Sequence, residues 1–286
     1  MQPEQDQSAA SDTTARAIAG VAALGARWDV AAFTETVSLY TDVHRELDWP
    51  GLLDPETIAY GPDPQQNFDL FRPEQAFSEP GPVFLFVHGN GLGADDWRIP
   101  GSDGLLLAHA GRIAATAGGL GVLMNYRTGA DVDAAADDLR AVVQWIRTNI
   151  APYGGDPNTI VVIGHSEGAL LTATYLFDEL SHPAGSGIAA AVLSSGLLGD
   201  DAPELASLID SYRGDRVPLA LWRAGFDTAE VRDNMQTFYE RLCAKFGGCP
   251  WYEQFDGYNH MSQLFSFGTD DSTVMNAFIR FYHTVR

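Results

Sequence analysis

The serine at position 166 lies at the centre of a Gly-His-Ser-Glu-Gly stretch at 164–168. A serine hydroxyl acts as a nucleophile only where it is exposed and a neighbouring base removes its proton. The stretch follows an apolar run at 159–163 and precedes a helix-forming run at 169–173. A strand, a sharp turn and a helix together provide that exposure. The pattern predicts that Ser166 is a nucleophile for acyl transfer, and the alternative is a serine in a structural turn.

The base would be a histidine, and seven histidines compete for the role. In chains with this strand-turn-helix order, the acid and then the histidine follow the serine. His182 stands beside Pro183 in a helix-to-loop stretch, and His283 falls in the last helical segment. His260 follows an apolar run in the loop 256–262, from which a side chain can project over the edge of a sheet. We predict His260 as the base, with an ordinary surface histidine as the alternative.

The acid that orients this histidine is predicted to be Asp227. It stands just past the apolar run 217–222, at the carboxyl end of an expected strand, where catalytic groups of α/β sheets gather. Asp256 is too close to His260 in sequence to orient it easily. The alternative role for Asp227 is the N-cap of a following helix, a position that aspartate favours.

Backbone N–H groups must face the negative oxygen of a tetrahedral intermediate, and each such donor is worth roughly 2.7 to 4 kcal/mol. The His-Gly-Asn-Gly stretch at 88–91, directly after the apolar run 83–87, is placed to provide them. We predict an oxyanion hole made by the amides of Asn90, Gly91 and Glu167, with Gly89 as the alternative donor in the loop. The alternative reading of the stretch is a simple turn.

The elements that must position these residues form a repeating pattern from Pro82 onward. Apolar runs alternate with helical segments, such as the one from Val132 to Ile146, and runs of this kind belong to a parallel sheet that is buried on both faces. We predict an α/β fold with a mostly parallel central sheet flanked by helices. The expected strands are Val83 to Val87, Gly121 to Asn125, Thr159 to Ile163, Ile188 to Leu193, Val217 to Trp222 and Trp251 to Phe255.

The domain organisation follows from where this pattern begins. Residues 1–12 are polar and predicted to be disordered, and residues 13–57 are predicted to form an N-terminal helical arm. In the arm, apolar residues lie close to one helix face, namely Trp28, Phe33, Val37 and Tyr40. The catalytic domain is predicted to span 58–286, with two edge strands at 57–60 and 67–71 and room for a cap-like insertion at 196–215.

Taken together, these motifs resemble the α/β-hydrolase superfamily, and within it the carboxylesterase group that includes hormone-sensitive-lipase-like and feruloyl-esterase-like enzymes. The resemblance extends from about Tyr60 to the C-terminus. It implies the α/β-hydrolase fold, with Ser166 as nucleophile, His260 as base, Asp227 as acid and the Asn90–Gly91 loop as oxyanion donor. The motifs are the segments at 88–91, 125–127, 153–157, 164–168, 225–227 and 258–262.

The activity that we expect is cleavage of carboxylic esters through an acyl-enzyme. One alternative is an amide or peptide-bond hydrolase, similar to arylformamidases or prolyl oligopeptidases, because the same triad serves both chemistries. A non-catalytic ligand-binding relative is a third reading. Trp97, Trp222 and Phe226 are predicted pocket walls, so the substrate is expected to be a small neutral ester with an apolar or aromatic part.

Two residues depart from the pattern of the group. Asn90 stands where a third glycine is usual, so its side chain is expected to narrow the acyl pocket. Glu167 follows the nucleophile where a small residue is usual, which places a carboxylate near the site.

Composition limits the other function classes. The formal net charge of −21 opposes binding to phosphate backbones, so nucleic acid is not an expected partner. The longest apolar runs are far shorter than the roughly 18 to 20 residues that cross a bilayer. No grouping of cysteine and histidine has the spacing of a metal site, and we expect neither a metal nor an organic cofactor.

The two cysteines, Cys243 and Cys249, flank a Gly-Gly pair and are predicted to form a small disulfide loop. A disulfide favours an oxidising compartment, so a periplasmic or secreted protein is expected. The polar start of the chain shows no export signal, and a cytoplasmic protein with two free thiols is the alternative. The oligomeric state has no signature in the sequence.

Overall fold

The computed structural model describes residues 11–75, 77–89, 96–128 and 132–285. Its centre is one eight-stranded sheet with the order β1-β2-β4-β3-β5-β6-β7-β8. The strands β1, β2 and β4 pair antiparallel, whereas β4, β3 and all later neighbours pair parallel. The strands are β1 (Glu56–Ala59), β2 (Asn67–Phe71), β3 (Gly81–Val87), β4 (Leu120–Met124), β5 (Gly155–His165), β6 (Ala190–Ser194), β7 (Leu219–Ala224) and β8 (Trp251–Phe255).

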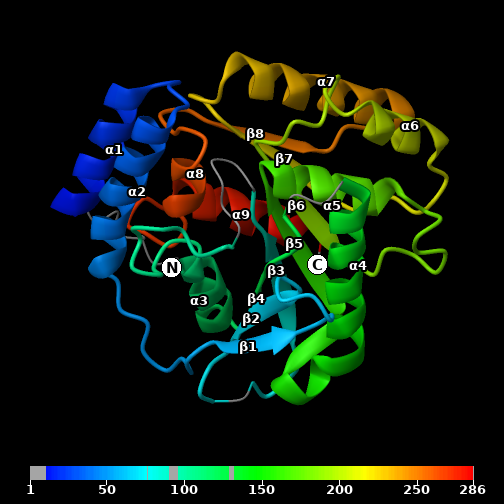
Figure 1. Cartoon of the computed structure of the whole chain (residues 1–286), viewed down its shortest axis with the longest axis horizontal. Helices are drawn as coiled ribbons and strands as arrows, with labels where there is room; N and C mark the ends of the chain where they lie inside the picture. Colours follow the sequence, from blue (N-terminus) through cyan, green and yellow to red (C-terminus); the bar gives the residue numbers. More distant parts are fainter. Residues whose placement is uncertain (1–10, 76, 90–95, 129–131, 286) are drawn as a thin grey trace, which may run out of the picture.

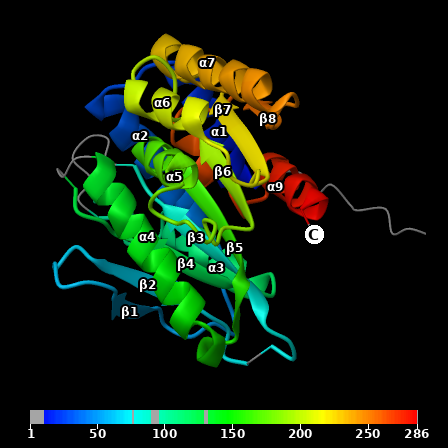
Figure 2. The same cartoon turned by 90° about the vertical axis from the view of Figure 1, so that its right-hand side faces the viewer.

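Helices cover both faces of this sheet, as the α/β pattern of the sequence predicts (Figure 1). One face is packed by α4 (Val132–Asn149), α5 (Glu167–Phe177), α6 (Pro203–Ser211) and α7 (Ala229–Phe246). Figure 2 shows α4, α5 and α6 in front of the strands. The other face is packed by α1 (Asp12–Leu24), α2 (Val30–Arg45), α3 (Ala108–Thr116), α8 (Ser262–Phe265) and α9 (Thr273–Thr284). A short 3-10 helix, η2 (Ala151–Tyr153), leads into β5.

The expected strands are confirmed, and the central ones are apolar runs that the two layers of helices bury, whereas the edge strand β8 is only partly buried. In β4 and β6 every residue is buried, and β3 has only Phe84 partly exposed. A strand that is buried on both faces carries no polar alternation, which is the pattern that marked these runs in the sequence. The parallel strands from β3 to β8 end at one edge of the sheet, and the expected catalytic residues follow three of them.

The N-terminal arm is helical, but the expectation of a single helix face that includes Trp28 is wrong. The arm consists of α1 and α2, which pack against each other. Gly25 ends α1 with φ 57°, a left-handed conformation that glycine adopts without strain. The Asp29 side chain then starts α2 by accepting a hydrogen bond of 2.8 Å from the Ala32 N–H. Trp28 therefore lies in the turn between the two helices, where it can point away from them.

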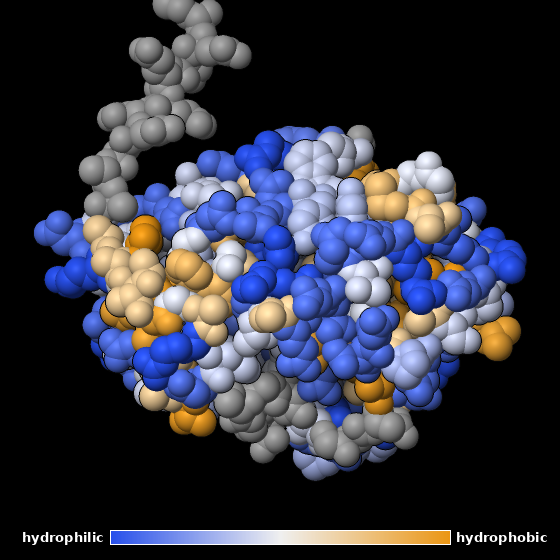
Figure 3. All heavy atoms as spheres, turned by 90° about the horizontal axis from the view of Figure 1, so that it is seen from above, coloured by the Kyte–Doolittle hydropathy of each residue, from blue (hydrophilic) through white to orange (hydrophobic). Residues whose placement is uncertain are grey.

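The C-terminal part of α7 is tied to the start of β8 by a disulfide between Cys243 and Cys249, as predicted. Gly247 ends the helix with φ 66° and turns the chain back toward the strand. On the chain-entropy account, closing so short a loop stabilises the fold by about 2 kcal/mol through its effect on the unfolded chain. Figure 3, a view from above over the α7 side, shows a mainly hydrophilic face, in keeping with the charge of −21.

Candidate active site

Ser166 is the single residue between the end of β5 and the start of α5. Its φ of 55° is positive, which is uncommon for a residue other than glycine and marks a strained turn. The flanking glycines permit this turn because α5 lies with its backbone against two strands. A Cβ on Gly168 would come 2.1 Å from the Val87 carbonyl oxygen, and one on Gly164 would come 2.4 Å from the Gly168 oxygen. Ser166 thus stands at a sharp strand-to-helix elbow.

Asp227 and His260 meet beside this elbow. The fully buried Asp227 follows β7, and its Oδ1 lies 2.8 Å from Nδ1 of His260, which is also buried. Thr228, not Asp227, is the N-cap of α7, because the Thr228 hydroxyl accepts a hydrogen bond from the Val231 N–H. The Asp227 carboxylate is therefore available to orient the His260 ring. Such a hydrogen bond holds Nδ1 as the protonated nitrogen and leaves Nε2 to act as a base.

The second carboxylate oxygen of Asp227 is held by two donors. Oδ2 accepts hydrogen bonds from the Ser195 hydroxyl at 2.6 Å and from the Ala224 N–H at 2.8 Å. Ser195 in turn accepts a hydrogen bond of 2.5 Å from the side-chain amide of the fully buried Gln263. A buried carboxylate needs such partners because burial without them is costly. Both carboxylate oxygens of Asp227 are thus held by hydrogen bonds.

Sequence reasoning missed Ser195 and Gln263, although one signal was present. Ser195 directly follows β6, the same position relative to a strand that identified Asp227. Ser195 also has a positive φ of 48°, which only the structure reveals. Gln263 lies three residues after His260, in the short helix α8, where nothing in the local sequence distinguishes it from an exposed polar residue.

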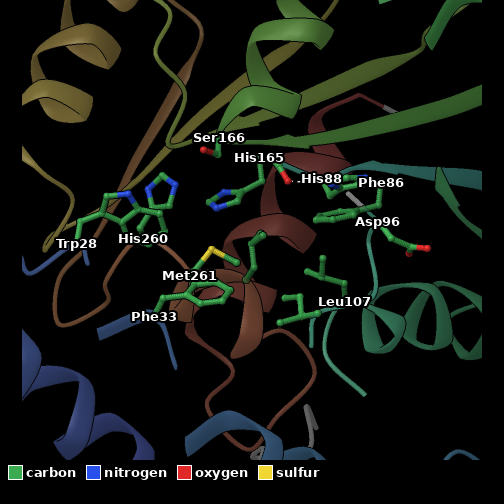
Figure 4. A pocket seen from close by; sticks show the side chains of 13 residues that line it. Trp28, Phe33, Phe86, His88, Asp96, Leu107, His165, Ser166, His260 and Met261 are labelled. Atoms are coloured by element: carbon green, nitrogen blue, oxygen red, sulfur yellow. Dashed lines mark hydrogen bonds between the residues drawn. The ribbon is translucent and has the colours of Figure 1, made fainter. Parts of the chain in front are cut away.

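Ser166 and His260 line one pocket, which is otherwise largely apolar (Figure 4). Two further histidines, His88 and His165, and the partly exposed Asp96 also face it. The apolar walls come from the N-terminal arm, from β3, from the segment before α3 and from the segment that carries His260. They are Trp28, Phe33, Phe86, Ile99, Leu107, Met261 and Leu264.

The prediction that Trp97, Trp222 and Phe226 form pocket walls is wrong, because none of the three lines this pocket. Trp222 lies on β7 and is fully buried, with the centroid of its ring 5.4 Å from that of Phe255. Trp97 is buried with its ring under the Arg98 guanidinium, at 4.6 Å. Phe226 packs at the margin of the same core cluster. These aromatic rings stabilise the fold, as the alternative reading of the sequence held.

The wall nearest the base comes instead from the N-terminal arm. The centroid of the Trp28 ring lies 4.5 Å from that of His260 in an edge-to-face contact. Phe33 on α2 also lines the pocket. The segment 196–215, where a cap was expected, contributes no residue to the pocket, and its helix α6 packs with α5 and α7. The N-terminal arm, and not the segment 196–215, therefore lies beside the base.

Of the predicted oxyanion donors, Asn90 and Gly91 lie outside the described residues. Gly89 is described and lies against the nucleophile, because a Cβ on it would come 2.8 Å from the Ser166 Cβ.

The loop is fixed at its start by two hydrogen bonds. Tyr126 Oη donates to the His88 carbonyl at 2.9 Å, and His88 Nδ1 lies 2.8 Å from the Gly89 carbonyl. Glu167 is the first residue of α5, so its N–H lies at a helix N-terminus, where negative charge is favoured.

The segment after His260 is held by two adjacent, buried histidines. His44 Nε2 lies 2.6 Å from the Phe265 carbonyl, and His109 Nε2 lies 2.9 Å from the Leu264 carbonyl. Their ring centroids are 4.3 Å apart. Burial lowers the pKa of His44 to about 4. Burial, and secondarily the neighbouring His44, lowers the pKa of His109 well below its ordinary value. Both rings are therefore neutral near pH 7.

No group of three or more His, Cys, Asp or Glu side chains that could hold a metal ion occurs in the described part of the chain. Within the same residues, no helix is long and apolar enough to cross a membrane.

The fold and the order of Ser166, Asp227 and His260 along the strands define the α/β-hydrolase class, and solved structures agree. Esterase B from Lactobacillus rhamnosis, inhibited by a tributyrin phosphonate, aligns with a TM-score of 0.67 at 16% identity, over 94% of this chain and 95% of that one. A hyperthermophilic esterase from the archaeon Pyrobaculum calidifontis gives 0.67 at 18% identity, over 97% and 99% of the two chains. At these identities the likeness concerns the fold.

Sequence comparison places the chain more narrowly. Residues 67–201 match the profile of the carboxylesterase family. Fumonisin B1 esterase of Sphingopyxis macrogoltabida is 31% identical over 126 residues, 41% of this chain and 23% of the relative. Cholinesterase of Mus musculus is 31% identical over 113 residues, 35% of this chain and 18% of the relative. The matched part is thus about a fifth to a quarter of these longer proteins. Residues 67–201 are therefore similar to the carboxylesterase family, within a chain that has the α/β-hydrolase fold.

The neutral histidine pair predicts a loss of stability in acid. Unfolding exposes His44 and His109, which then bind protons below the reference pKa of about 6.5. The unfolded state therefore gains protons between about pH 6.5 and 4, so stability falls as the pH falls. Each such histidine contributes a slope of about 1.4 kcal/mol per pH unit. Urea unfolding between pH 7 and 5 should show a slope reduced by that amount in His109→Gln.

The exposed His283 on α9 supplies the matched control for this measurement. His283→Gln should keep the wild-type slope. An unchanged slope in His109→Gln would show that the buried pair does not set the acid limit.

Proposed function

We propose that the protein is a serine carboxylesterase that cleaves small neutral esters through an acyl-enzyme. The observation that carries the proposal is the pairing of the buried Asp227 with His260 in the pocket that Ser166 lines. In the first step, His260 Nε2 takes the proton of Ser166 as its Oγ attacks the ester carbonyl. The C–O bond to the alcohol breaks, and the proton passes from His260 to the departing alcohol.

The second step repeats the chemistry with water. His260 removes a proton from a water molecule that attacks the acyl-enzyme, and the acid leaves as Ser166 recovers its proton. Asp227 stabilises the imidazolium that forms in both steps. The N–H of Glu167 and the amides of Asn90 and Gly91, or of Gly89, are proposed to stabilise the oxyanion, as expected from the sequence.

Two features support an ester substrate. The matched relatives are named as esterases, although they are longer proteins. The pocket walls are mostly apolar, which suits a neutral substrate with an apolar part. The described residues of the pocket offer no arginine or lysine to bind a substrate carboxylate.

The main alternatives are an amide hydrolase and a non-catalytic binder, and kinetics separate them. We expect 4-nitrophenyl esters to be cleaved much faster than the matching 4-nitroanilides. Ser166→Ala and His260→Ala should each lower kcat by roughly 10⁴-fold or more, the range measured when one member of a serine hydrolase triad is removed. The control is Ser211→Ala, which removes an exposed hydroxyl on α6 and should leave kcat unchanged. Faster cleavage of the anilides would favour the amide hydrolase, and no cleavage of either would favour the binder.

A second prediction concerns Ser195, which we propose as a positioning residue for Asp227. Removing a hydrogen bond to a charged group costs about 1.5 to 3 kcal/mol, or roughly 10- to 150-fold in rate if the loss falls on the transition state. Ser195→Ala should therefore lower kcat by about that factor with KM nearly unchanged, and Tm should also fall because the lost hydroxyl is buried. A parallel loss of Tm without a change in kcat would assign Ser195 a structural role alone.

The disulfide supports a proposal on location. Disulfides persist in oxidising compartments, so we propose that the protein acts outside the cytoplasm, in the periplasm or as a secreted enzyme. Blocking free thiols before lysis of the cells that produce the protein should recover Cys243 and Cys249 as one linked peptide. Alkylated cysteines would favour the cytoplasm.

A further inference from the structure

His165 is the last residue of β5 and immediately precedes the nucleophile. Its side chain is buried and lines the pocket, with its ring centroid 4.7 Å from that of His260. Figure 4 shows the two imidazoles side by side below Ser166, facing the space that Met261 and Phe33 border. His165 is therefore within reach of a molecule bound at Ser166.

One nitrogen of this ring is paired and the other is not. Nδ1 lies 3.3 Å from Oγ of the fully buried Ser194. Nε2 is buried and has no hydrogen-bond partner among the described residues. Leaving a buried polar atom unpaired costs about 1 to 3 kcal/mol, so such atoms are few in native proteins. An unpaired nitrogen in the wall of a binding pocket is explained if a ligand supplies the partner.

The chemistry of the ring limits what that partner can be. Burial, and secondarily the neighbouring His260, lowers the pKa of His165 well below its ordinary value, so the ring is neutral. A neutral Nε2 is a donor in one tautomer and an acceptor in the other. A hydroxyl group can both donate and accept, and so it pairs with either tautomer.

The other unpaired imidazole nitrogens do not fit this role as well. His44 and His109 hold the α8 segment in the core and do not line the pocket. His88 lines the pocket, but its ring is stacked on Tyr126, at 4.8 Å, and its Nδ1 is held by the Gly89 carbonyl. Among these rings, only His165 adjoins both Ser166 in sequence and His260 in space.

We propose that His165 determines substrate specificity by binding, through Nε2, a hydroxyl group that the ester carries near its scissile bond. The inference rests on the proposed esterase function and narrows its substrate class to hydroxy-substituted esters. The rest of such a substrate is apolar, because Phe33, Phe86 and Leu107 surround the remaining space. The hydroxyl belongs either to the acyl part or to the alcohol part, and the test separates these two sources.

The test uses two pairs of esters in which a hydroxyl replaces a methyl group of similar size. The acyl pair is 4-nitrophenyl 3-hydroxybutyrate and 4-nitrophenyl 3-methylbutyrate, and the alcohol pair is 2-hydroxyethyl butyrate and propyl butyrate. For one pair, the wild-type kcat/KM should favour the hydroxy ester by about 10-fold or more, the discrimination expected from a buried hydrogen-bonding group. In His165→Phe the ratio should fall to about one, while cleavage of the methyl ester persists.

His283→Phe makes the same substitution at an exposed position on α9 and should keep the wild-type ratio. His165→Met is measured in the same way if His165→Phe does not fold. A wild-type ratio near one for both pairs, or a preference that survives in the His165 variants, would overturn the proposal. Cleavage of the methyl esters without discrimination refutes only this inference, whereas no cleavage of any ester refutes the proposed function.

Discussion

The close approach of α5 to the sheet is the constraint on which the site depends. Gly168 lies against the carbonyl of Val87 and Gly164 lies against Gly168, so no side chain fits at either position. With the helix this close, the chain turns from strand to helix within one residue, and Ser166 takes a positive φ. The hydroxyl is thereby carried to the pocket at the helix N-terminus, a place that favours negative charge. Larger residues at the glycines would move α5 and displace the nucleophile.

A second requirement is that a buried carboxylate stays fixed. Asp227 is fully buried, yet each of its oxygens has a partner in His260, Ser195 or the backbone of Ala224. These partners come from the ends of β6 and β7 and from the loop after β8, so the parallel sheet itself brings them together. The same edge of the sheet carries Ser166. The pair formed by Asp227 and His260 therefore depends on the register of the whole sheet and not on local sequence.

The sequence predicted the strands, and it predicted that Ser166, Asp227 and His260 lie at one edge of the sheet, because each residue directly follows an apolar run or lies in the loop after one. It failed for Trp222, since a strand buried on both faces gives no indication of which face a ring occupies. The contact between Trp28 of the N-terminal arm and His260 also had no signal in the sequence. Contacts between segments this far apart in the chain have no local pattern. Gln263 was missed for the same reason, whereas Ser195 directly follows β6 and carried the signal that identified Asp227.

Covalent labelling tests whether Ser166 is the activated nucleophile. The folded protein would be treated with a fluorophosphonate, digested and mapped by mass spectrometry. We expect one phosphonylated residue, Ser166. Labelling should be abolished in Ser166→Ala and greatly slowed in His260→Ala. Labelling of a different serine, or none in protein shown to be folded, would contradict it.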